Sequence, residues 1–263
     1  MRRTVLCTIA TLLIGLANGC ATSHTPLAAA DSPATQPAKA KPVILFVHGA
    51  WGGAWSFQQL DSIMTADGFK VYRPTLTGLG EKVHLATPDI GLDTHIMDIV
   101  NVIKFENLHD IILVGHSYGG MVISGVAEKV PDRIGRMIYI DALLPNDGES
   151  VDDVFPRGRD MPRANGFIPF NWATNPTPPM DVPQPAKTFS DKITLNNPAA
   201  AKIPVTYVLT VDQGNQPSQD EFYSFYQRAI ARGYKTAIMT GPHNVQRDMP
   251  KETAKLLESL LAN

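Results

Sequence analysis

One serine has the surroundings that a catalytic nucleophile requires. Gly115-His116-Ser117-Tyr118-Gly119 has the spacing G-x-S-x-G, and it lies between the apolar run Ile111–Val114 and a stretch with helical spacing. A serine at such a sharp turn from strand to helix is strained and exposed, and flanking glycines supply the room that the turn needs. The N-terminus of the helix also places partial positive charge where an oxyanion develops. These features predict that Ser117 is catalytic.

A serine hydroxyl needs a base, and the base needs a carboxylate that orients it. His243 is the only histidine after Ser117, and it lies in the loop that follows the last predicted strand, so we expect it to be the base. Asp212 is our choice for the carboxylate, because it directly follows the predicted strand Val205–Thr210 and its flanking valine. Asp141 competes with it, because Asp141 also lies at the end of a predicted strand.

Acyl transfer at a serine also requires two N–H groups that hold the developing oxyanion. The N–H of Tyr118, directly after the nucleophile, is the expected first donor. The expected second donor is the N–H of Ala50, in the loop His48-Gly49-Ala50-Trp51-Gly52-Gly53 after the apolar run Val43–Val47. The glycines of that loop permit close approach of its backbone to a substrate.

Buried strands and amphipathic helices alternate along the chain and would hold these residues. Continuous apolar runs are typical of strands that are buried on both faces of a parallel sheet. Such runs occur at Val43–Val47, Ile111–Val114, Met137–Ile140 and Val205–Thr210, and a shorter strand is expected at Lys235–Met239. Helical spacing of apolar residues separates them, as in Thr94–Leu108 and Gln219–Arg232. The alternation predicts an α/β fold with a mostly parallel central sheet flanked by helices.

The segment 145–204 interrupts this alternation and holds 11 of the 21 prolines. A structureless loop of this length is improbable within a compact domain, so we expect a cap inserted over a pocket; the alternative is an excursion over the surface. Aromatic residues of the cap and of the first loop are expected to line the pocket or to pack the cap on the core: Trp51, Trp55, Phe167, Phe170 and Trp172.

The N-terminal residues predict export. Arg2 and Arg3 precede the apolar stretch Thr4–Ala17, which has the size of a secretory signal and is short for a transmembrane span. Ala17-Asn18-Gly19-Cys20 resembles a bacterial lipobox, which makes residues 1–19 a signal peptide and Cys20 the candidate lipidation site of an envelope lipoprotein. Cleavage after Ala28-Ala29-Ala30, giving a soluble periplasmic or secreted protein, is the alternative.

Composition restricts the partners. Residues 20–42 are rich in Ala, Ser, Thr and Pro and are predicted to be a flexible tether, which leaves 43–263 for the folded domain. The net charge of -2 gives no basic face for nucleic acid. The two cysteines, Cys7 and Cys20, exclude a disulfide framework and a zinc site built from three or four cysteines. We therefore expect a small-molecule partner, no cofactor or metal, and membrane contact only through a lipid anchor.

Four motifs together resemble the α/β-hydrolase superfamily. They are His48-Gly49-Ala50-Trp51-Gly52-Gly53-Ala54-Trp55, the G-x-S-x-G turn, Thr210-Val211-Asp212 and Gly241-Pro242-His243. More narrowly, they are similar to plant methyl-ester esterases, hydroxynitrile lyases and bacterial pyrethroid-hydrolase-like esterases, over roughly residues 43–261. The resemblance implies an eight-stranded type of core, a small lid after the sixth strand, and a cofactor-free Ser-His-Asp mechanism.

The same resemblance implies hydrolysis of carboxylic esters through an acyl-enzyme. The aromatic residues of the candidate pocket suit small to medium, apolar or aromatic substrates. The hydroxynitrile lyases of this group have a lysine directly after the catalytic histidine, and this chain has Asn244 there, which disfavours the lyase reaction. A non-catalytic, ligand-binding member of the fold is the other alternative. The complete candidate triad disfavours it.

Overall fold

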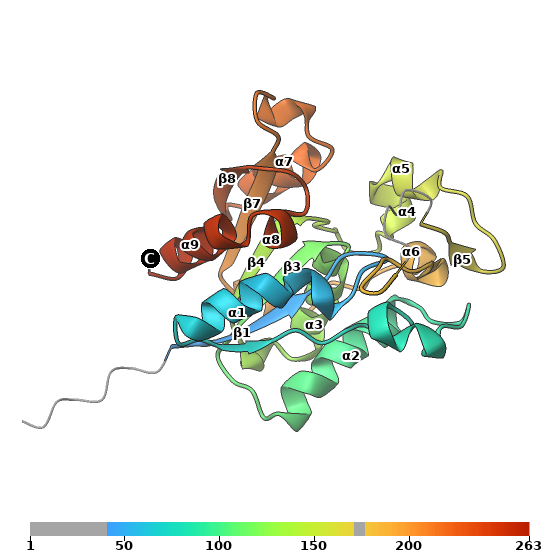
Figure 1. Cartoon of the computed structure of the whole chain (residues 1–263), viewed down its shortest axis with the longest axis horizontal. Helices are drawn as coiled ribbons and strands as arrows, with labels where there is room; N and C mark the ends of the chain where they lie inside the picture. Colours follow the sequence, from blue (N-terminus) through green and yellow to red (C-terminus); the bar gives the residue numbers. More distant parts are fainter. Residues whose placement is uncertain (1–40, 171–176, 263) are drawn as a thin grey trace, which may run out of the picture. The chain divides into compact units, whose positions relative to one another are not determined.

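The computed structural model describes residues 41–170 and 177–262. Its centre is a sheet of six strands in the order β2-β1-β3-β4-β7-β8, in which every neighbouring pair is parallel (Figure 1). The strands are β1 (Val43–Val47), β2 (Lys70–Tyr72), β3 (Ile111–Ser117), β4 (Ile134–Ala142), β7 (Val205–Val211) and β8 (Lys235–Thr240). The parallel α/β sheet predicted from the sequence is confirmed. The eight-stranded core implied by the resemblance is corrected, because this sheet has six strands in the described part of the chain.

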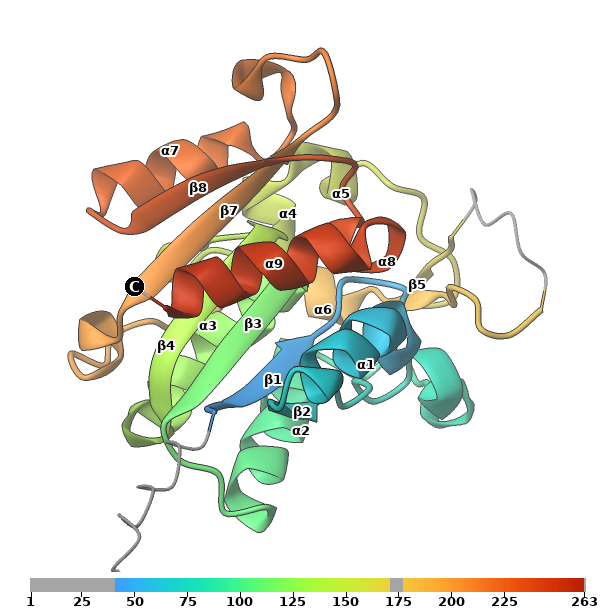
Figure 2. The same cartoon turned by 60° about the vertical axis from the view of Figure 1, so that its left-hand side comes forward.

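Helices cover both faces of the sheet. The helices α1 (Gln58–Ala66), α8 (Val245–Asp248) and α9 (Pro250–Leu261) lie on the near face in Figure 2, and α2 (Leu92–Phe105), α3 (Gly119–Lys129) and α7 (Tyr223–Ala231) cover the other. Strand β1 shows why the sheet needs both layers: Ile44 and Phe46 belong to one apolar core, whereas Leu45 and Val47 belong to the other. Successive side chains of a strand point to opposite faces of the sheet, so a strand whose residues are all apolar is buried on both faces.

Within the described residues, five short 3-10 helices complete the connections: η1 (Ala54–Phe57), η2 (Gly80–Leu85), η3 (Pro131–Arg133), η4 (Ala200–Lys202) and η5 (Pro217–Gln219). The helix predicted for Gln219–Arg232 starts only at Tyr223. The reason is local, because the side chain of Asp220 accepts a hydrogen bond from the N–H of Phe222 and ends the preceding 3-10 turn.

The turn between β3 and α3 depends on two adjacent glycines. A Cβ on Gly119 would lie 2.5 Å from the carbonyl oxygen of Val47, and one on Gly120 would lie 2.0 Å from the carbonyl oxygen of Leu143. These distances are far below van der Waals contact. Glycine is therefore required for the start of α3 to approach the ends of β1 and β4, which brings three strand ends to one place.

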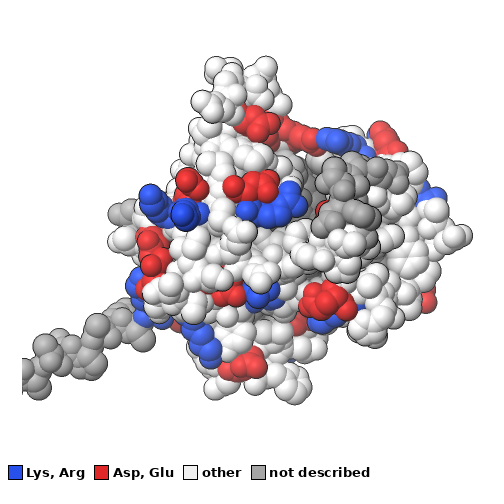
Figure 3. Space-filling view, viewed as in Figure 1, with Lys and Arg blue, Asp and Glu red and all other residues white. Residues whose placement is uncertain are grey.

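The segment between β4 and β7 has secondary structure of its own. It contains α4 (Val151–Val154), α5 (Pro156–Arg159), α6 (Lys187–Ser190) and a two-stranded antiparallel sheet of β5 (Phe167–Ile168) and β6 (Gln184–Pro185). These elements occupy the 145–204 range in which the sequence predicts a cap. Figure 3 shows acidic and basic side chains interspersed on one face of the molecule.

The predicted signal peptide and most of the predicted tether lie outside the described residues. Within the part that the structure describes, no helix combines the length and the apolar character that a membrane crossing requires.

His95 of α2 is fully buried and joins two loops near the turn after β3. Its Nε2 lies 2.9 Å from the carbonyl oxygen of Thr77, so Nε2 carries the proton and donates it. Its Nδ1 lies 2.9 Å from the hydroxyl of Tyr118 and accepts. One neutral tautomer satisfies both contacts, and burial lowers the pKa of His95 to about 4.

This burial predicts a loss of stability in acid. A histidine in the unfolded chain titrates near 6.5, so between that pH and about 4 the unfolded chain binds one more proton than the folded chain. The free energy of unfolding therefore decreases as the pH is lowered through this range. The glutamine of His95→Gln cannot titrate. We therefore expect the difference in free energy of unfolding between wild type and variant, measured by urea unfolding, to shrink by roughly 1–3 kcal/mol from pH 7 to pH 4. His84→Gln, at an exposed histidine, serves as the matched control for the substitution itself. A difference for His95→Gln that does not change with pH would contradict the assignment of His95 as a buried neutral histidine.

Candidate active site

Ser117 ends β3 in a strained conformation. Its φ of 54° lies in the left-handed region, which a residue with a Cβ rarely adopts. A Cβ on Gly49 would lie only 3.0 Å from the Cβ of Ser117, so the loop after β1 packs directly against the serine. The strand, turn and helix that the motif predicts are all present. They hold the serine at the wall of a cavity that His243 also lines.

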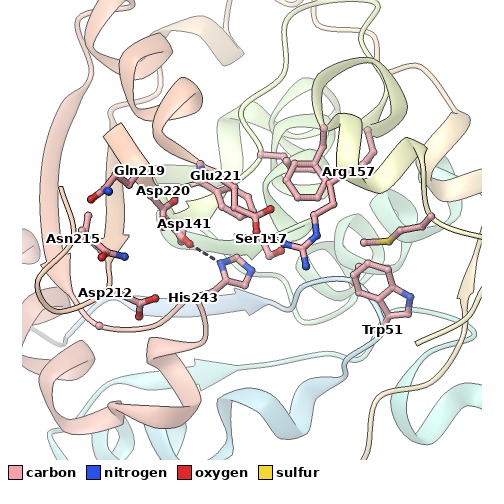
Figure 4. Close-up of a pocket in the computed structure, with 18 of the residues that line it drawn as sticks. Trp51, Ser117, Asp141, Arg157, Asp212, Asn215, Gln219, Asp220, Glu221 and His243 are labelled. Carbon is pink, nitrogen blue, oxygen red and sulfur yellow. Dashed lines mark hydrogen bonds and ion pairs between the residues drawn. The ribbon is translucent and has the colours of Figure 1, made fainter. Parts of the chain in front are cut away.

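His243 follows β8 and is hydrogen-bonded to a buried carboxylate. Its Nδ1 lies 2.6 Å from Oδ2 of Asp141, as the dashed line in Figure 4 shows. The other oxygen of Asp141 accepts a hydrogen bond from the N–H of Thr210 at 3.0 Å. A carboxylate on Nδ1 keeps the proton there and leaves Nε2 as the acceptor, which is the tautomer that a general base needs.

The carboxylate that contacts His243 is therefore Asp141, and the choice of Asp212 for this place is corrected. Asp212 is exposed in the turn that follows β7 and lines the same cavity. In the described part of the chain, the carboxylate hydrogen-bonded to His243 is that of Asp141 and not that of Asp212. Both carboxylates end neighbouring parallel strands, so chain order and strand position do not distinguish them.

A backbone irregularity decides between the two. The pairing of β3 with β4 shifts at the end of the strands: His116 pairs with Ile140 and Ser117 pairs with Ala142. Asp141 is the extra residue, with a φ of 45°. Such bulges redirect a side chain. The bulge accounts for how the carboxylate of Asp141 reaches both β7 and His243.

Two further rings hold His243. The ring of Phe222 stacks on it, with centroids 4.8 Å apart and an interplanar angle of 16°. The ring of His116 lies 4.6 Å away, and its Nε2 donates a hydrogen bond to the carbonyl oxygen of His243 at 2.9 Å. Burial, followed by the nearby His243, lowers the pKa of His116 well below its usual range, so His116 is neutral. Phe222 could not be identified from the sequence, because its position is set by the tertiary fold.

The loop after β1 is fixed by hydrogen bonds from several directions. His48 donates from Nδ1 to the carbonyl oxygen of Gly49 at 2.8 Å and accepts at Nε2 from the N–H of Leu76 at 3.1 Å. Burial lowers its pKa to about 4. The N–H of Trp51 is bound to Oε1 of Gln184 at 2.9 Å, whereas the N–H of Ala50 has no partner within residues 41–170 and 177–262. Ala50 and Tyr118 stay the predicted oxyanion donors.

Two cavities meet at the serine. The larger has a volume of about 420 Å³ and is lined from the cap by Val151, Phe155, Arg157, Met161 and Phe189. The smaller has a volume of about 140 Å³. Four residues line both cavities: Ala50, Trp51, Ser117 and His243.

The aromatic residues predicted for the pocket have different fates. Trp51 lines both cavities, and Trp55 and Phe170 line the smaller one. Phe167 lies in β5 and contributes to neither, whereas Trp172 lies outside the described residues. Phe189, which the prediction omitted, lines the larger cavity and packs edge-on against Trp51.

Charged groups surround the mouth of the larger cavity. Arg157 of α5 forms an ion pair with Glu221, which links the cap to the segment before α7 (Figure 4). Asp220 is half-buried in the cavity wall, and burial together with the charge of Asp141 raises its pKa to about 6. Asp212 also lines the wall, so carboxylates outnumber cations there.

Known proteins are similar to this chain in sequence and in fold. A sequence profile of the alpha/beta hydrolase family matches residues 44–256. The chain belongs to the alpha/beta hydrolase family. It is 30% identical over 240 residues to a carbendazim hydrolyzing esterase of Nocardioides sp. (strain SG-4G), covering 82% of this chain and 98% of that protein.

Plant and bacterial relatives extend the comparison. The alpha/beta hydrolase is 30% identical over 207 residues to a pFDCC methylesterase of Arabidopsis thaliana, covering 65% of this chain and 77% of the relative. An extracellular alpha/beta-hydrolase from a Paenibacillus species has a similar structure, with a TM-score of 0.69 and 26% identity over 82% of this chain and 98% of that one. The chain is a carboxylesterase-type hydrolase.

The contact between Asp141 and His243 predicts different effects of two matched variants. Asp141→Asn keeps the shape but favours the wrong tautomer of His243, so we expect kcat for an activated ester to fall about 10²–10⁴-fold. Asp212→Asn, at the exposed carboxylate, should change kcat less than about tenfold. The reverse order of the two effects would assign the orienting role to Asp212.

Proposed function

We propose that this hydrolase cleaves carboxylic esters with Ser117 as nucleophile, His243 as general base and Asp141 as the orienting carboxylate. The observation that carries the proposal is the 2.6 Å contact between Nδ1 of His243 and the buried Asp141, at a cavity that Ser117 shares. The strained turn at Ser117 supports the same reaction, since strain at a non-glycine residue is maintained where function requires it.

In the proposed acylation, Nε2 of His243 takes the proton of Ser117 as its oxygen attacks the acyl carbon. The N–H groups of Ala50 and Tyr118 stabilise the oxyanion. His243 then protonates the leaving alcohol, and the acyl group stays on Ser117 as an ester. In deacylation, Nε2 of His243 takes a proton from the water that attacks the acyl-enzyme. His243 then returns the proton to Ser117 as the acid leaves, and Asp141 stabilises the charged imidazole in both stages.

The proposed substrates are neutral esters with an apolar or aromatic acyl group of small to medium size. The larger cavity has a volume of about 420 Å³ and is walled by Phe155, Phe189 and Phe222 among others, which suits such groups. Its carboxylates disfavour a substrate that carries a negative charge. Relatives named as a carbendazim hydrolyzing esterase and a pFDCC methylesterase support ester hydrolysis itself.

The nucleophile is tested by Ser117→Ala. We expect this variant to lose hydrolysis of p-nitrophenyl esters by several orders of magnitude while its circular dichroism spectrum stays that of the wild type. A fluorophosphonate probe should label the wild type and not the variant. A panel of esters of rising acyl length, with methyl esters and pyrethroids, then defines the acyl preference. Retained esterase activity in Ser117→Ala would refute the proposed mechanism.

We further propose that the protein is exported and anchored by a lipid on Cys20. The support is the lipobox-like stretch Ala17-Asn18-Gly19-Cys20 after an apolar run, together with an extracellular relative of similar structure. In a bacterial host, labelled palmitate should enter the wild type and not Cys20→Ala. Absence of label from both proteins, with export retained, would favour the soluble secreted form.

A further inference from the structure

In the proposed reaction the ring of His243 becomes positively charged. When Nε2 takes the proton of Ser117, both ring nitrogens hold a proton and the imidazole becomes an imidazolium. Groups that stabilise this charge lower the barrier of acylation, and they lower the barrier of deacylation in the same way. The side chains that contact the ring of His243 therefore contribute to the rate.

Asp141 stabilises the charge from one direction only. Its Oδ2 lies 2.6 Å from Nδ1 of His243, and it is the carboxylate that forms an ion pair with this ring in the described part of the chain. A hydrogen bond to a ring nitrogen meets the edge of the ring, so the carboxylate leaves both faces of the imidazole uncovered.

The ring of Phe222 covers one face of the imidazole. The two ring centroids are 4.8 Å apart and the planes are nearly parallel, with an angle of 16°. Phe222 is 5% exposed, so its ring is almost completely shielded from water. The face of a phenyl ring carries partial negative charge, and it attracts a cation within about 6 Å of its centroid, most strongly where water is excluded. The stack therefore becomes more favourable when His243 is charged.

The cap and the start of α7 hold Phe222 in this place. The N–H of Phe222 donates a hydrogen bond to Oδ1 of Asp220 at 2.8 Å, which fixes the backbone before the helix. Phe155 of the cap stacks on the ring of Phe222, with centroids 5.6 Å apart and an angle of 29°. The neighbouring Glu221 forms an ion pair with Arg157 of the cap. Phe222 thus contacts both the cap and the general base.

We propose that Phe222 is a positioning residue of the reaction: its ring face stabilises the charged imidazole of His243, and the cap holds the ring there through Phe155. The inference rests on the proposed ester hydrolysis. The attraction becomes strong only while His243 is charged, so it acts on the transition state and not on the free enzyme. Its removal should lower kcat and kcat/KM by the same factor and leave KM constant.

Replacement of Phe222 by pentafluorophenylalanine tests the charge of the ring face. Fluorination keeps an apolar ring of nearly the same shape and makes its face electron-poor. We expect kcat and kcat/KM for p-nitrophenyl acetate to fall about tenfold, with KM within about twofold of the wild type. A ring that only packs the cap on the core would not respond in this way. Unchanged kcat in the folded, fluorinated protein would overturn the proposal.

Replacement of Phe225 by pentafluorophenylalanine is the matched control. Phe225 is 2% exposed and its centroid lies 5.9 Å from that of Phe222, but His243 is not among the rings that it contacts in the described residues. We expect kcat of this protein to stay within about twofold of the wild type. An equal loss at both positions would contradict the proposal, because fluorine would then act through packing of the segment.

Two genetic variants give the same comparison if the fluorinated protein does not fold. Phe222→Leu keeps an apolar side chain without a negatively charged face, whereas Phe222→Tyr keeps the aromatic face. We expect kcat to fall about tenfold in Phe222→Leu and to stay within about threefold of the wild type in Phe222→Tyr. Equal kcat values of the two variants would refute the role of the ring face.

The contribution of the cap is tested by Phe155→Leu in two backgrounds. In the wild type this change should lower kcat for p-nitrophenyl acetate severalfold, because the ring of Phe222 loses its stacking partner. In Phe222→Leu the same change should alter kcat by less than about twofold, because the two effects act through one ring. The same factor in both backgrounds would show that Phe155 does not act through Phe222.

The failure of the inference is distinguishable from that of the proposed function. Hydrolysis of p-nitrophenyl acetate by the wild type and not by Ser117→Ala tests the reaction alone, without Phe222. If this difference is absent, the proposed function is wrong. If it is present and fluorination at position 222 has no effect on kcat, the function stands and only the role of Phe222 is wrong.

Discussion

The hydrogen bond between the buried carboxylate of Asp141 and Nδ1 of His243 is the interaction on which the site depends. A carboxylate with no exposed surface is unfavourable unless hydrogen bonds compensate the loss of water, and here Thr210 and His243 supply them. Each donor belongs to a different part of the fold: Thr210 to β7 and His243 to the loop after β8. The bulge at the end of β4 thus places Asp141 where it contacts the neighbouring strand β7 and also holds the proton on Nδ1 of His243.

Three neutral histidines continue this linkage through the surrounding loops. His48, His95 and His116 each donate one hydrogen bond to a carbonyl oxygen and accept one at the other ring nitrogen. A buried ring that uses both nitrogens fixes two segments at once. His48 joins the loop after β1 to Leu76, and His116 joins the nucleophile turn to the backbone of His243. Protonation would remove the acceptor in each case, so the geometry of the site requires that these rings stay neutral.

The proposed nucleophile and base can be chosen from the sequence because local signals indicate them. The glycines around Ser117 follow from the sharpness of one turn, and His243 is the one histidine in the remaining chain. The carboxylate was not predictable in the same way, because Asp141 and Asp212 end adjacent strands and a single bulged residue decides between them. The cap illustrates the same limit. Its aromatic residues are visible in the sequence, but the sequence does not reveal that Phe189 of α6 lines the cavity whereas Phe167, paired in β5, does not.

Trp51 connects the position of the cap to the division between the two cavities. Its φ of 61° is unusual for a residue with a large side chain, and β6 stabilises it because Oε1 of Gln184 accepts a hydrogen bond from its N–H. The indole N–H donates to the carbonyl oxygen of Ile168 in β5, and the carbonyl oxygen of Trp51 accepts from Val182. Every polar group of this residue is thus bound to the cap, while the residue lines both cavities. A displacement of β5 and β6 would therefore move Trp51 and with it the wall that the two cavities share, so the cap and the loop after β1 act as one unit in shaping the site.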